Sequence, residues 1–96
     1  MTLEFTTEEM LSKLISFDTV SNKTNLPLIE FVSNYLKSHD IEVNLIYNAT
    51  RTKANLYAQI GPSVPGGFIL SGHTDVVPID GQEWHTNPFI LTEDSK

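Results

Sequence analysis

His73 and Asp75 are the residues whose types and spacing are best suited to chemistry. They follow the apolar run 68–70 almost directly, separated from it by Ser71 and Gly72. Open α/β folds place their sites at the carboxyl ends of buried strands, and residues i and i+2 of a strand point to the same face. A histidine binds a divalent metal through one ring nitrogen, and a carboxylate often accepts a hydrogen bond from the other. The spacing therefore suggests that His73 is a metal ligand and Asp75 its supporting acid, with Gly72 allowing a close backbone approach.

The same residues have a second interpretation, in which His73 is an ordinary hydrogen-bonded histidine of the core. A single His-x-Asp is common by chance, whereas zinc sites take three or four protein ligands. His85 is a weak candidate for a second ligand because it lies in a loop, and His39 is expected to cap a helix end. Asp80 and Glu83 are expected to be solvated loop charges. Spacing alone leaves both interpretations of His73 open.

The charge of the chain excludes one broad class of function. Six Lys and Arg against twelve Asp and Glu give a net charge of −6, and no basic residue lies between Lys53 and Lys96. Binding of nucleic acid through phosphate neutralisation is therefore not expected, and the acidic second half suits a cation. The chain has no cysteine, so thiolate ligands are excluded. Without a signal peptide or an apolar run long enough for a membrane span, we expect a cytoplasmic location and no membrane partner.

Two helices are predicted in the first part of the chain. Thr6 and Glu9 have the spacing of a capping box, and apolar residues at helical spacing predict a helix over residues 7–17. A second helix is predicted to begin around residues 25–27, where Pro27 is tolerated in the first turn, and to continue to about His39.

The period then changes to alternation, which predicts β-structure. Strands are expected over residues 41–47 and 54–60, joined by a polar turn as an antiparallel hairpin. The continuous apolar run 68–70 is typical of a central strand covered on both faces, and residues 90–96 suggest one more strand. Trp84, Pro88 and Phe89 are expected to anchor the intervening loop. The order of elements predicts an incomplete α/β layer, and a compact chain of this size would expose roughly 5,500 Å².

Residues 68–78, which read FILSGHTDVVP, resemble the first metal-ligand motif of a known family. The family comprises zinc-dependent amidohydrolases and exopeptidases, among them acetylornithine deacetylase, succinyl-diaminopimelate desuccinylase and aminoacylase. Residues 15–21, 53–61, 80–84 and 87–89 are also similar to segments of this family, so the resemblance covers nearly the whole chain. The short spacing between residues 76–78 and Trp84 favours the acetylornithine deacetylases over the desuccinylases.

The resemblance implies a fold, a site and a reaction. Residues 1–96 would be the amino-terminal portion of an α/β catalytic domain, a helix-flanked mixed sheet that is truncated here. His73 would bind one metal of a two-zinc site, with cobalt as an alternative metal, and Asp75 would orient that ligand as a catalytic residue. The reaction implied is hydrolysis of N-acetylornithine to ornithine and acetate in arginine biosynthesis, with a glutamate as general base. The full-length protein would be a homodimer that acts on a small N-acyl amino acid.

The family's remaining motifs do not occur in these residues. The bridging aspartate, the Glu-Glu pair and the last histidine are all absent. We therefore expect an amino-terminal fragment that is inactive alone, binds zinc weakly or not at all, and self-associates through an unpaired sheet edge. Two alternatives remain: another N-acyl-amino-acid hydrolase of the same family, or a small interaction domain without catalysis.

Overall fold

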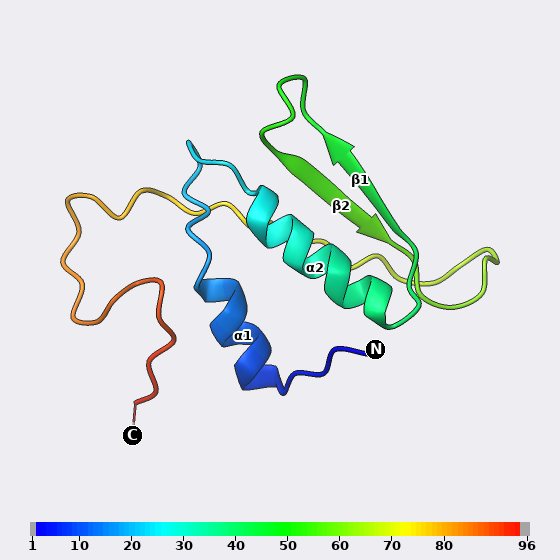
Figure 1. Ribbon diagram of the computed structural model, residues 1–96, viewed down its shortest axis with the longest axis horizontal. Helices are drawn as coiled ribbons and strands as arrows, with labels where there is room; N and C mark the ends of the chain where they lie inside the picture. The colour runs from blue at the N-terminus through cyan, green and yellow to red at the C-terminus, as the bar shows by residue number, and fades with distance from the viewer. Residues whose placement is uncertain (1, 95–96) are drawn as a thin grey trace.

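The computed structural model describes residues 2–94 and contains two helices and two strands in that range. In chain order these are α1 (Thr7–Ile15), α2 (Leu26–Ser38), β1 (Val43–Tyr47) and β2 (Ala54–Ala58). Figure 1 shows α2 lying along the β1–β2 hairpin, with α1 beyond it. The predicted class, an incomplete mixed α/β unit, is confirmed. Neither helix in the described range combines the length and apolar content needed to span a bilayer.

Helix α1 begins at the predicted capping box. The Glu9 N–H donates to Thr6 Oγ1 at 3.1 Å, and the Thr6 N–H donates to Glu9 Oε1 at 2.9 Å. Hydrogen bonds to the Glu9 carboxylate, from the Thr6 backbone N–H first and from the Thr6 side chain second, hold the pKa of Glu9 below its ordinary value. The helix ends at Ile15 instead of residue 17, because Ser16 is its C-cap and donates its hydroxyl to Lys13 O at 2.6 Å.

Helix α2 ends in a Schellman motif. The Asp40 N–H donates to Lys37 O at 3.0 Å, and the Ile41 N–H donates to Leu36 O at 3.1 Å. Asp40 occupies the left-handed position of the motif with φ 60°, where glycine is the usual residue. Ile41 is therefore part of the helix end, which explains why β1 begins at Val43 instead of the predicted residue 41.

Strands β1 and β2 form the predicted antiparallel hairpin, with Val43 opposite Ala58 and Tyr47 opposite Ala54. Asn48 organises the turn between them. Its Oδ1 accepts hydrogen bonds from the N–H groups of Thr52 and Lys53 at 2.9 and 3.1 Å. Strand β2 ends at Ala58, before the predicted end at residue 60, and the Ile60 side chain is largely exposed.

The core of the described chain lies between α2 and the hairpin. Leu28 and Ile29 of α2 pack against Ala54 of β2, and all three are buried. Asn25, the N-cap of α2, ties the helix to the same strand. Its Nδ2 donates to Ala54 O at 2.9 Å, and its Oδ1 accepts from the Ala54 N–H at 3.0 Å. Asn25 thus satisfies both backbone groups of the first residue of β2, as a neighbouring strand would.

The predicted central strand over 68–70 is not formed. Phe68, Ile69 and Leu70 are 100, 89 and 97% exposed, because within residues 2–94 no other strand pairs with this segment and no helix covers it. Residues 90–94 do not form a strand either, and the predicted continuation through 95–96 lies outside the described residues. The segment after β2 passes behind α2 as an extended trace (Figure 1). The accessible surface is 7992 Å², above the roughly 5,500 Å² of a compact chain of this length.

Candidate functional site

The structure brings His73 and Asp75 into contact. His73 Nδ1 lies 3.0 Å from Asp75 Oδ1 and 3.1 Å from the backbone oxygen of Asp75. Both oxygens are acceptors, so Nδ1 carries the proton and Nε2 of the neutral ring presents its lone pair. The two side chains are 85 and 59% exposed. In this chain His73 is therefore not a core histidine, and its Nε2 is accessible to a ligand.

The backbone around Asp75 is held in place by a segment that is distant in the sequence and lies in the turn between α1 and α2. Val20 and Val76 form an isolated parallel bridge. The Val76 N–H donates to Thr19 O at 3.1 Å, and the Ser21 N–H donates to Val76 O at 3.0 Å. The backbone of the site is thus supported by this isolated β-bridge, instead of by the central strand that the sequence predicts.

Two hydroxyl groups add to this bridge. Thr19 Oγ1 donates to Thr74 O at 2.5 Å, and Ser21 Oγ donates to Val76 O at 3.0 Å while lying 3.4 Å from Asp75 Oδ2. Thr19 is only 6% exposed. Sequence reasoning did not assign either hydroxyl to the site. The one available signal was that residues 15–21 share the family resemblance, which does not show that they contact residues 74–76.

The segment that supports the site is itself held by ionic and polar contacts. Asp18 Oδ1 accepts from the Val20 N–H at 3.2 Å, and Lys23 Nζ donates to Asp18 Oδ2 at 2.5 Å. The hydrogen bond from Lys23 is the main reason that the pKa of Asp18 lies below its ordinary value. Lys53, in the hairpin turn directly before β2, donates from its Nζ to the backbone oxygen of Ser21.

The remaining sequence candidates do not complete a metal site. No three His, Asp or Glu side chains within residues 2–94 converge on a position that could hold a metal ion. His85, Asp80 and Glu83 are exposed. His39 is the C-cap of α2 as predicted, and its Nε2 donates to Leu3 O at 2.7 Å. The residues present therefore supply one oriented ligand position and not a complete zinc site, which requires at least three protein ligands.

The expected role of Gly72 is wrong for this chain. A Cβ at this position would meet no heavy atom within 4 Å, and its φ is not in the left-handed region. Within residues 2–94 no other segment packs against the Cβ position of Gly72, because the segment on this side of the site is exposed. By contrast, the predicted turn at Asp80-Gly81 is formed, and Gly81 adopts φ 75° there.

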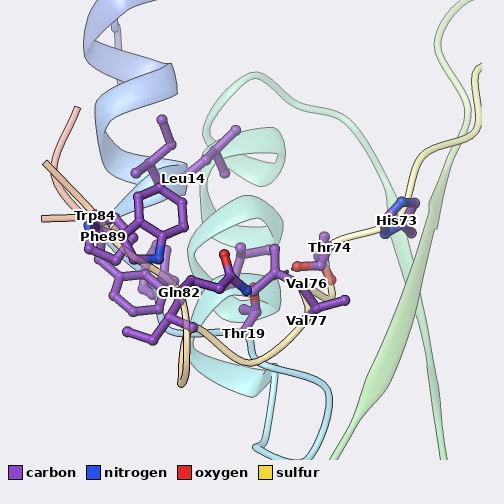
Figure 2. A pocket seen from close by; sticks show the side chains of 14 residues that line it. Leu14, Thr19, His73, Thr74, Val76, Val77, Gln82, Trp84 and Phe89 are labelled. Carbon is purple, nitrogen blue, oxygen red and sulfur yellow. Dashed lines mark hydrogen bonds between the residues drawn. The ribbon is translucent and has the colours of Figure 1, made fainter. Parts of the chain in front are cut away.

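An apolar pocket of about 470 Å³ adjoins the site. Figure 2 shows Trp84 and Phe89 beside Leu14 at one end of it, with His73 at the other end. The predicted anchors Trp84, Pro88 and Phe89 all line this pocket, although Trp84 remains 51% exposed. The loop therefore contributes a wall of the pocket and not a closed core.

The fold and the site thus define a small mixed α/β unit that presents one carboxylate-oriented histidine. Known proteins with similar sequences are acetylornithine deacetylases. That of Pasteurella multocida (strain Pm70) is 39% identical over 92 residues, covering 88% of this chain and 24% of the relative. Those of Proteus mirabilis (strain HI4320) and Buchnera aphidicola subsp. Schizaphis graminum (strain Sg) are 41 and 35% identical, over 79 and 88% of this chain and 20 and 23% of the relatives.

The predicted resemblance is thereby confirmed, and the chain is homologous over most of its length to one stretch of the acetylornithine deacetylases. It spans about a fifth to a quarter of the length of these curated relatives. No protein-family model and no solved structure matches it.

Proposed function

We propose that this chain is the amino-terminal part of a metal-dependent acetylornithine deacetylase, which hydrolyses N-acetylornithine to ornithine and acetate in arginine biosynthesis. The observation that carries the proposal is the sequence identity to proteins of that name, combined with the accessible, carboxylate-oriented imidazole of His73. A single alignment over 88% of the chain includes residues 73–75 wherever it begins.

In the proposed site, His73 contributes one metal ligand through Nε2. Asp75 accepts a hydrogen bond from the Nδ1–H group, and so keeps the lone pair of Nε2 directed outward. Zinc, or cobalt in its place, would polarise the acyl carbonyl and lower the pKa of a bound water. The other ligands and the general base would come from residues outside 2–94. The 96-residue chain alone is accordingly proposed to be inactive and to bind zinc weakly.

The proposal is tested by substituting His73 in the intact protein that contains this chain. His73→Ala removes a metal ligand, so turnover of N-acetylornithine should fall by more than about 100-fold, because even outer partners of metal ligands are worth roughly 10–100-fold. Bound zinc, measured by elemental analysis, should fall with it. His85→Ala is the matched control, since it removes an exposed imidazole of the same chain and should leave both quantities unchanged.

The outcomes separate the alternatives. Retention of most turnover and zinc in His73→Ala would overturn the assignment of this residue. A protein that prefers N-succinyl-diaminopimelate would be a desuccinylase, and one that prefers other N-acyl amino acids would be an aminoacylase. An intact protein that hydrolyses none of these substrates would favour the non-catalytic interaction domain.

A further inference from the structure

We propose that Thr19 is a positioning residue for the His73–Asp75 pair. Its side chain and its backbone both contact the segment on either side of Asp75. The hydroxyl donates to Thr74 O at 2.5 Å, and the backbone oxygen accepts from the Val76 N–H at 3.1 Å. One residue thus holds the peptide groups before and after Asp75, and thereby limits the rotation of the Asp75 backbone.

The exposure of the His73–Asp75 pair explains why the Asp75 backbone needs to be held by Thr19. The side chains of His73 and Asp75 are 85 and 59% exposed, so surrounding atoms do little to restrict them. His73 Nδ1 lies within hydrogen-bond distance of two Asp75 oxygens, one in the side chain and one in the backbone. Both oxygens move with the Asp75 backbone. The orientation of the His73 ring therefore depends on how firmly that backbone is held.

Thr19 is suited to this role because it is fixed itself. It is 6% exposed, and the neighbouring Val20 is equally buried. The turn that carries both is held by Asp18 and Lys23 on one side and by Lys53 on the other. Ser21 adds a second hydroxyl contact to Val76 O, but it is exposed and its contact with the Asp75 carboxylate is long, at 3.4 Å.

The test compares Thr19→Val, which removes the hydroxyl and keeps the shape, with Thr19→Ser, which keeps the hydroxyl. The first readout is the tautomer of the neutral His73 ring in the metal-free intact protein, measured by nitrogen-15 NMR. The wild type and Thr19→Ser should hold the proton mainly on Nδ1, whereas Thr19→Val should shift a substantial fraction to Nε2. The second readout is zinc affinity, which should fall by about tenfold in Thr19→Val and recover in Thr19→Ser.

Ser33→Ala is the control for a purely structural role, because Ser33 is a buried hydroxyl of α2 with 3% exposure. It should lower the melting temperature without changing the His73 tautomer. An unchanged tautomer in Thr19→Val, with a melting temperature lowered as in Ser33→Ala, would overturn the proposal. A shifted His73 tautomer in Thr19→Ser would also overturn it. This comparison with the wild type can be made even if the Thr19→Val variant does not fold.

The measurement of zinc affinity rests on the proposed function, whereas the measurement of the His73 tautomer does not. A wild type that binds no zinc would count against the metal site alone. The NMR comparison on the metal-free protein would still decide whether Thr19 positions the pair.

Discussion

Asp40 holds a backbone conformation that is costly for most residues. Its φ of 60° is required by the Schellman motif at the end of α2. Glycine adopts this conformation without steric cost because it has no Cβ. Asp40 also places a negative charge at the negative end of the helix dipole. We expect Asp40→Gly to raise the free energy of unfolding by about 1 kcal/mol, as measured by chemical denaturation.

Asp40→Ala separates the two causes of that gain. Alanine removes the charge but keeps a Cβ in the left-handed conformation, so it should stabilise the protein less than glycine does. An equal gain in the alanine and glycine variants would show that the charge, and not the backbone, is responsible.

Among single residues, those that act over short sequence distances could be predicted. Thr6 and Glu9 were identifiable from their spacing, and the proximity of His73 to Asp75 follows from alternation along an extended chain. Thr19 could not be identified, because its partner Thr74 is 55 residues away and a threonine carries no sign of what its hydroxyl will meet. Asp40 was missed for another reason, since a Schellman motif is usually recognised in a sequence by a glycine at this position.

At the scale of the element, the start of α1 should respond to acid. The pKa of Glu9 is lowered in the folded chain by the hydrogen bonds from Thr6. The stabilisation by the ionised form is therefore fully present above the unfolded pKa, and it is lost as the pH falls through the lowered folded value. We expect protection of the α1 amides from hydrogen exchange to be constant near neutrality and to decline below about pH 4.

Glu9→Gln removes the ionisable group, so this part of the acid-induced loss should disappear. Glu8→Gln is the matched control, because Glu8 lies in the same first turn but outside the capping box, and its variant should still show the decline. If the Glu9→Gln variant kept the full decline, the capping box would not be its origin.

Elements stabilised by their own neighbours in sequence were predicted well, and the one that needs distant neighbours was not. The two helices and the hairpin appear within a few residues of their expected bounds. The run 68–70 has the composition of a central strand, but burial of a strand is a property of the segments beside it. Within residues 2–94 no strand lies beside it, so its backbone has no ladder to join.

At the scale of the whole molecule, the chain is expanded for its length. Its radius of gyration is 15.7 Å, whereas a compact chain of this length has about 12.5 Å. The difference arises in the residues after β2, where several large apolar side chains are exposed, among them Phe68, Leu70 and Val77. Exposed apolar surface beside unpaired backbone groups favours association.

We expect the 96-residue chain alone to self-associate, with a mass in sedimentation equilibrium that rises with concentration. Ile69→Lys places a charge in the exposed run and should shift the chain toward monomer. Val64→Lys is the control, because Val64 is also exposed, at 63%, but lies in the preceding loop. A wild-type chain that stays monomeric across a wide concentration range would contradict this prediction.

The bridge between Val20 and Val76 also bears on the order in which the site can form during translation. Thr19 and its turn leave the ribosome well before Thr74, which contacts it from 55 residues further along the chain. Helix α2 and the hairpin lie between these segments and can fold from their own local contacts in the meantime. The emerging His73-Thr74-Asp75 segment thus meets a partner that has already been synthesised, and its closing contacts are among the last that this part of the chain makes.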